Sequence, residues 1–160
     1  MKNNFYNKNI REVIIIEEAQ YRDSKKISEI DESRFFKSYE LEYIQSLIEN
    51  DLYLNLVAKK ENTIIAFIII QKVLDVSEII TIAVIKNYEG LGICHKLILD
   101  AIDRLKKLNV KSITLEVSNT NLRAINLYSK NNFKKKSLRK NYYTDRIGKK
   151  TDAYLYEQKL

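Results

Sequence analysis

Apolar runs and amphipathic stretches alternate along the chain, and their spacing predicts most of its elements. Runs rich in β-branched residues predict strands over residues 13–17, 53–59, 64–73, 77–84 and 112–117. Apolar residues at helical spacing predict helices over residues 24–36, 39–49, 91–108 and 122–130, with Ser24 as the cap of the first. Two strand-like stretches, 133–143 and 153–160, complete the pattern.

Three of the predicted strands follow one another closely, which indicates a meander. Strands 53–59, 64–73 and 77–84 are separated by short turns at Glu61-Asn62 and Leu74-Asp75. Connections this short join antiparallel neighbours. Neither repeats nor linkers interrupt the sequence. We therefore expect one α+β domain over residues 1–160 with a mostly antiparallel sheet.

The composition is typical of a soluble globular protein. Of the 160 residues, 45% are hydrophobic and 31% charged, which excludes disordered, collagen-like and disulfide-scaffold classes. The single cysteine, Cys94, cannot form an internal disulfide, and Cys94 with His95 cannot make a metal site. The longest apolar run, 64–70, is too short to cross a bilayer, and the N-terminus has no signal-peptide core. We expect a cytoplasmic protein with neither metal nor membrane partner.

The net charge of +7 comes from one segment. Residues 130–150 hold nine Lys or Arg against one acid, Asp145, and the remainder of the chain is nearly neutral. One interpretation is a solvated lysine-rich surface. The other is contact with an anionic partner, such as a nucleotide phosphate or RNA.

Glycine is scarce, yet two of the three glycines stand two residues apart. Gly90 and Gly92 lie where the strand predicted over 77–84 meets the helix predicted over 91–108. A glycine turn at a helix N-terminus exposes backbone N–H groups at the positive end of the helix dipole, which suits a phosphate. The same pair is also consistent with a tight turn that needs positive φ.

Short motifs follow one another along the chain in the order found in one enzyme superfamily. They are Ala66-Phe67, Gln71, Val73-Leu74-Asp75, Ile82-Ala83-Val84, Gly90-Leu91-Gly92, Leu115-Glu116-Val117, Ala124-Ile125, Leu127-Tyr128 and Asn141-Tyr142-Tyr143. Together they resemble the GCN5-related N-acetyltransferase superfamily and, within it, the RimI-like ribosomal-protein-alanine N-acetyltransferases. The resemblance implies a mixed, mostly antiparallel central sheet flanked by helices on both faces. It also implies acetyl-CoA as co-substrate and the N-terminal amine of a ribosomal protein as acceptor.

The resemblance assigns roles to particular residues. Glu116 would be the base that deprotonates the amine, and Tyr128 the acid that protonates the departing thiolate. Tyr142, Tyr143 and Phe35 would border the acceptor groove. Contacts to acetyl-CoA would come from Ile82, Ala83 and Val84 along the pantetheine, from Tyr88, Glu89, Gly90, Leu91, Gly92 and Ile93 around the pyrophosphate, and from Asn121.

Several of these residues also have a purely structural interpretation. In this interpretation, Glu116 is the outward-facing residue of a strand whose other face is apolar, and Tyr128 is an aromatic residue of the core. Asn121 is a natural N-cap, a role compatible with a ligand contact. Tyr142 and Tyr143 are adjacent in a strand, so we expect only one to face the groove.

The sequence departs from its relatives before the glycine pair. Relatives usually carry Gln or Arg and further basic residues there, whereas this chain has Asn87-Tyr88-Glu89 and a shortened segment. A carboxylate at position 89 would oppose a pyrophosphate, and we expect Lys130 or Lys134 to supply the compensating charge. We also expect at least one of Phe35 and Phe36 to pack in the core.

Two other functions remain open at this point. A polyamine or aminoglycoside acetyltransferase would favour an acidic groove, which Glu40, Glu42 and Glu49 could provide. The basic segment 130–150 is instead consistent with an RNA- or ribosome-binding module that retains a degenerate CoA site.

Overall fold

The computed structural model describes residues 13–145 and 147–160. Its helices are α1 (Ser24–Arg34), α2 (Leu41–Ile48), α3 (Ile93–Lys107) and α4 (Leu122–Lys130), and single 3₁₀ turns lie at Tyr21–Asp23 and Lys86–Tyr88. Its strands are β1 (Ile14–Glu18), β2 (Tyr53–Lys60), β3 (Thr63–Val73), β4 (Val76–Val84), β5 (Ser112–Ser118), β6 (Lys134–Thr144) and β7 (Lys150–Lys159). Every predicted element is therefore present, with ends shifted by at most a few residues.

The strands form one seven-stranded sheet in the order β1-β2-β3-β4-β5-β7-β6. All neighbours are antiparallel except β4 and β5, which run parallel. The predicted meander is confirmed in β2, β3 and β4. Glu61 and Asn62 in its first turn both have positive φ, as a tight hairpin turn between twisted strands requires.

Helices cover both faces of the sheet, as expected, and each face has its own apolar core. On one face, α3 buries Leu97 and Leu105 against Leu56 and Ile68 of the central strands. On the other face, α1 and α2 pack against a second cluster made of Ile27, Ile30, Ile44, Leu47, Val57, Phe67 and Ile69. The alternation along β2 and β3 sends neighbouring residues into different cores, which fixes the register of these strands.

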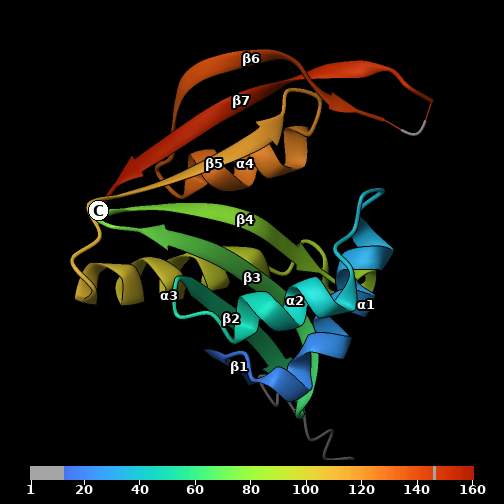
Figure 1. The fold of residues 1–160 in the computed structure, drawn as a ribbon, viewed down its shortest axis with the longest axis vertical. Coiled ribbons are helices and arrows are strands. Elements are labelled where there is room, and N and C mark those ends of the chain that lie inside the picture. The colour runs from blue at the N-terminus through green and yellow to red at the C-terminus, as the bar shows by residue number, and fades with distance from the viewer. Residues whose placement is uncertain (1–12, 146) are drawn as a thin grey trace, which may run out of the picture.

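The two parallel strands stay together for only part of their length. β4 and β5 pair from Val76↔Ser112 to Ile79↔Leu115. The register between β3 and β4 shifts at Ile69/Ile70, where Ile80 is the extra residue. A bulge bends its strand and increases the local twist, and this one lies directly after the last β4–β5 pair. β4 and β5 meet at one end and separate toward the other (Figure 1).

The basic segment forms the outer hairpin of the sheet. β6 is the last strand in the order and pairs only with β7, and the two strands extend beyond the rest of the sheet (Figure 1). Gly148, with φ +80, lies in the turn between them and donates its N–H to Asp145 O at 3.1 Å. Part of the positive charge is paired locally, since Lys136 lies 2.9 Å from Glu157.

The start of α1 differs from the prediction. Ser24 is the first helical residue rather than the cap, because a 3₁₀ turn leads directly into the helix. Asp23 accepts a hydrogen bond from Gln20 N at 2.8 Å and so closes that turn. Among the described residues, no helix is long and apolar enough to cross a membrane.

Candidate active site

The separation of β4 from β5 opens a cavity of about 1250 Å³. β4, β5, the start of α3 and α4 contribute to its lining, together with the end of α1 and the loop that follows it. The cavity brings together the residues that the sequence singled out at scattered positions. Those that line it are Phe35, Ile82, Ala83, Val84, Tyr88, Glu89, Gly90, Gly92, Ile93, Glu116, Asn121, Tyr128 and Tyr143. Leu91, which is 62% exposed, and Tyr142, which is 48% exposed, do not line it.

The loop before α3 presents bare backbone to the cavity. Gly90 and Gly92 both have φ +76, a conformation that other residues rarely adopt. In the described part of the chain, the N–H groups of Gly90, Leu91, Gly92 and Ile93 form no hydrogen bond. They lie at the N-terminus of the 15-residue helix α3, whose first residue is Ile93, and the helix dipole adds positive potential there. The arrangement is suited to bind an anion such as a phosphate.

The edge of β4 provides a second stretch of accessible backbone. Beyond Ile79, the side of β4 that faces β5 has no strand partner in the described chain. Ile82, Ala83 and Val84 lie on this stretch and line the cavity. An extended polar chain can therefore bind along β4 by backbone hydrogen bonds, in the manner of an added strand.

Helix α4 begins at the cavity and carries Tyr128 two turns further on. Asn121 caps the helix, and its Oδ1 accepts the Ala124 N–H at 3.1 Å, so the predicted cap is confirmed. Tyr128 is only 6% exposed and packs its ring edge-on against Phe133, with the centroids 5.7 Å apart. Burial raises the pKa of Tyr128, so the phenol keeps its proton at neutral pH.

Glu116 lies on β5 beyond the last pair with β4, and its side chain is 11% exposed. Arg139 Nη1 of β6 lies 2.8 Å from Glu116 Oε1. A hydrogen bond with Glu116 raises the pKa of Tyr142, and burial together with the Glu116 charge raises the pKa of Tyr143 to about 12. Glu116 is therefore the centre of a group of polar side chains that the hairpin brings across β7. Arg139 was not among the predicted site residues, because it lies 23 residues from Glu116 in the chain and only the fold brings the two together.

The two tyrosines of the hairpin take different positions, as expected from their adjacency. Tyr143 lines the cavity, whereas Tyr142 remains half exposed. Their rings nevertheless meet edge to face, with centroids 5.1 Å apart. Asn141 has positive φ and the β6–β7 register shifts between Arg139 and Tyr143, which breaks the strict alternation of a strand.

The loop after α1 is fastened to the cavity by a buried carboxylate. Asp31, 1% exposed, accepts Tyr39 N–H at 2.8 Å and the Thr81 hydroxyl at 3.3 Å. Its burial raises its pKa. The expectation that Phe35 or Phe36 packs in the core is wrong, since they are 38% and 55% exposed. Both residues lie just beyond the end of α1. They belong to the loop that the Asp31 hydrogen bonds hold at the cavity, and not to the apolar core.

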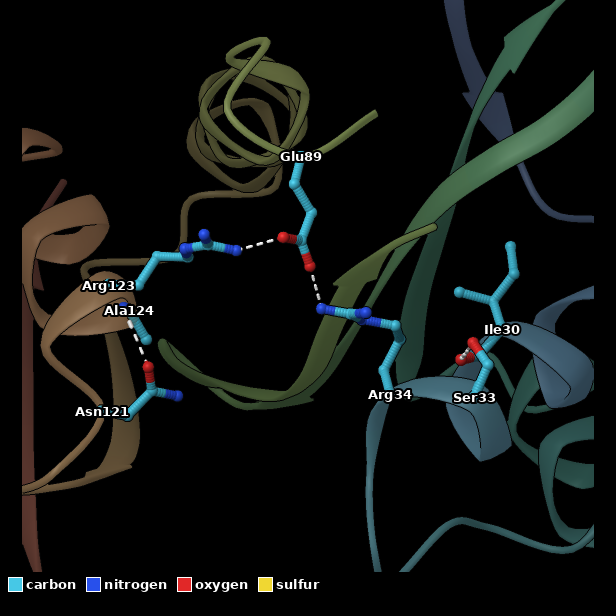
Figure 2. Close-up of polar contacts among 7 residues, drawn as sticks. All are labelled: Ile30, Ser33, Arg34, Glu89, Asn121, Arg123 and Ala124. Atoms are coloured by element: carbon cyan, nitrogen blue, oxygen red, sulfur yellow. Dashed lines mark hydrogen bonds and ion pairs between the residues drawn. The ribbon is translucent and has the colours of Figure 1, made fainter. Parts of the chain in front are cut away.

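Glu89 does not face the cavity as an uncompensated charge. Its carboxylate forms ion pairs with Arg34, at the end of α1, and with Arg123, in the first turn of α4 (Figure 2). These pairs, the Arg123 hydrogen bond first, lower the pKa of Glu89. We expected Lys130 or Lys134 to supply this charge. Lys130 lines the cavity and Lys134 does not, but the cations in contact with Glu89 are the two arginines.

Comparison with known proteins agrees with this arrangement. A sequence model described as the acetyltransferase (GNAT) family matches residues 17–133. The chain belongs to the acetyltransferase (GNAT) family. It is therefore an N-acetyltransferase, and its α+β fold, with helices around one mixed sheet, is the GNAT fold.

Relatives and solved structures extend the match over nearly the whole chain. The ribosomal protein bS18-alanine N-acetyltransferase of Haemophilus influenzae is 34% identical over 137 residues, which are 79% of this chain and 93% of the relative. The crystal structure of the ribosomal-protein-S18-alanine N-acetyltransferase from Escherichia coli superposes with a TM-score of 0.86 at 28% identity, covering 92% of this chain and 94% of the other. Arabidopsis thaliana NAA60, solved in complex with acetyl-CoA, has the same fold, with a TM-score of 0.84 at 20% identity over 92% and 99% of the two chains.

In this GNAT protein, the three glutamates that could have formed an acidic groove for a polycationic acceptor lie outside the cavity. Glu40, Glu42 and Glu49 do not line the cavity. The acids that do are Asp31, Glu89 and Glu116, each of which has hydrogen-bond or ion-pair partners within the protein. The cavity lacks the concentration of free carboxylates that an acceptor with several positive charges would favour.

Cys94 lines the cavity beside these groups, and it is the only cysteine in the chain. Burial raises the pKa of its thiol to about 11, against an ordinary value of 9.0. Only the thiolate reacts, so at pH 8 the folded protein should react with a small disulfide reagent about a hundredfold more slowly than the chain unfolded in guanidinium. The measurement is the rate of thiol modification from pH 7 to 11. Equal rates in the two states at pH 8 would contradict the raised pKa of Cys94.

Proposed function

We propose that this GNAT protein transfers an acetyl group from acetyl-CoA to the N-terminal alanine of ribosomal protein bS18. The observation that carries the proposal is that one continuous cavity joins the N–H cradle at the start of α3 to Glu116, Tyr128 and Tyr143. One end suits an anion and the other carries groups that can move protons. Relatives named for bS18-alanine acetylation, at 34% identity, support the choice of acceptor.

The residues present fit acetyl-CoA. The unpaired N–H groups of residues 90–93 suit the pyrophosphate, and the free edge of β4 at Ile82–Val84 suits the amides of the pantetheine arm. Asn121 and the start of α4 lie on the opposite wall. When bound, acetyl-CoA supplies an acetyl thioester, and the protein's own residues orient the acceptor and manage the protons.

Glu116 and Tyr128 divide the proton transfers between them. An N-terminal ammonium has a pKa near 8, so Glu116, directly or through a water, takes a proton and frees the nitrogen lone pair. The nitrogen bonds to the acetyl carbon, the carbon–sulfur bond breaks, and the electron pair leaves with sulfur. Tyr128 gives its proton to that sulfur. The newly bonded nitrogen loses its second surplus proton to solvent, which reprotonates Tyr128, and Glu116 releases the first proton to solvent. Because burial raises its pKa, the phenol is protonated at neutral pH, the form that a donor requires.

Arg139 and Tyr142 hold the Glu116 carboxylate in position. Phe35 and Tyr143 border the cavity nearby and give the acceptor peptide apolar contact. Because partial burial raises the pKa of Cys94, it is a poor nucleophile, and direct attack by the amine needs no acyl-enzyme.

The acceptor is tested by thiol release from acetyl-CoA. A peptide with the bS18 N-terminus should be turned over, whereas the same peptide with a blocked N-terminus should be inert even if it contains lysine, because only the α-amine titrates near neutral pH. Spermine tests the small-molecule alternative. Turnover of spermine at a rate equal to that of the peptide would contradict the proposed acceptor.

The catalytic assignment is tested with Glu116→Gln and Tyr128→Phe. Each removes one proton transfer, so we expect kcat to fall by about a hundredfold, while acetyl-CoA binding in calorimetry changes little. Glu42→Gln in α2 and Tyr21→Phe in the 3₁₀ turn before α1 make the same substitutions at exposed positions that do not line the cavity, and should leave kcat unchanged. Unchanged turnover in Glu116→Gln and Tyr128→Phe would remove both residues from the mechanism.

A further inference from the structure

Arg34, Glu89 and Arg123 form an ion cluster that joins three separate elements at the rim of the cavity. Arg34 Nη2 contacts Glu89 Oε1, and Arg123 Nη1 contacts Glu89 Oε2. Glu89 lies between the two guanidinium groups (Figure 2). The side chains are 29%, 20% and 76% exposed, in that order along the chain. All three line the cavity.

Both arginines project from helix ends that local hydrogen bonds fix in place (Figure 2). In the last turn of α1, the Ser33 hydroxyl donates to Ile30 O at 2.8 Å. In the first turn of α4, Asn121 accepts Ala124 N–H at 3.1 Å. The backbone of both helix ends is therefore held in place. The ion pairs with Glu89 in addition restrict the two long arginine side chains.

The cluster lies against the anion cradle. Glu89 is the residue directly before Gly90, whose loop exposes the unpaired N–H groups of residues 90–93. Two guanidinium groups and one carboxylate leave a net charge of +1. Each guanidinium carries five N–H donors in a planar fork, and one nitrogen of each is directed to Glu89. Donors remain on both arginines for a second anion.

We propose that Glu89 is a positioning residue that holds Arg34 and Arg123 at the cradle, where their remaining N–H groups bind the pyrophosphate of the acetyl donor. The inference rests on the proposed function, in which that donor is acetyl-CoA. Arginine matches phosphate oxygens in two-point geometry. A free, largely exposed arginine such as Arg123 loses side-chain entropy when it orders on a ligand, and an ion pair formed in advance reduces that loss.

The proposal makes a prediction opposite to simple charge repulsion. A carboxylate beside a pyrophosphate should weaken binding through its charge alone, so Glu89→Gln should then bind CoA more tightly. If Glu89 orients the arginines, the same substitution weakens binding. Because the pairs are partly exposed, we expect a modest effect, with the Kd for CoA raised about fivefold.

Calorimetry of the full chain with CoA and with dephospho-CoA, and an NMR titration with pantetheine, test the proposal. For Glu89→Gln we expect weaker binding of CoA and dephospho-CoA alike, since both carry the pyrophosphate, and unchanged binding of pantetheine, which carries no phosphate. The exposed variant Arg123→Gln should show the same pattern. The loss of affinity in the double variant Glu89→Gln/Arg123→Gln should be smaller than the product of the two single losses, because the two residues act together. Glu42→Gln is the matched control and should bind like the wild type.

Unchanged or tighter CoA binding by Glu89→Gln would overturn the proposal. A loss confined to CoA would assign the cluster to the 3′-phosphate instead, and an equal loss for pantetheine would indicate general damage to the cavity, so either result also overturns it. Absence of CoA binding by the wild type is a separate outcome, since it would contradict the proposed donor itself.

Discussion

The parting of β4 from β5 is the constraint on which the rest of the site depends. The strands pair over four positions and then separate, directly after the bulge at Ile80. Had they remained paired, the β4 edge at Ile82–Val84 would be occupied and no cavity would form between β4 and α4. The bulge breaks the regular register, and the sheet tolerates this because α3 and α4 pack around the opening and contribute to one continuous core.

The cavity has two ends of different construction. The end at Gly90 and Gly92 is made of backbone N–H groups, so its suitability for an anion does not depend on the side chain at position 89. The Glu89 carboxylate is, in addition, paired with two arginines. The other end is made of side chains around Glu116, whose partners come from the outer hairpin. Part of that basic hairpin thus serves the site directly through Arg139, in addition to any contact it makes with an anionic partner.

Local patterns predicted the elements because their causes are local. Helical spacing marked α3, an amide at position 121 capped α4, and the glycine pair marked a turn with positive φ. The ion pairs of Glu89 could not be predicted, because they join residues 55 and 34 positions apart whose meeting depends on how three helices are placed. The same holds for Arg139 with Glu116, and for the exposure of Phe35 and Phe36, which depends on where the loop after α1 is fastened.

The central claim is that the opening between β4 and β5 holds the acetyl donor against the backbone before α3. Residue-resolved NMR of amide hydrogen exchange, with and without acetyl-CoA, tests it most directly. The account predicts slowed exchange at Gly90, Leu91, Gly92 and Ile93, whose N–H groups gain acceptors, and no change at Gly148 in the distant hairpin turn. Saturating acetyl-CoA that leaves exchange at residues 90–93 unaltered would contradict the account.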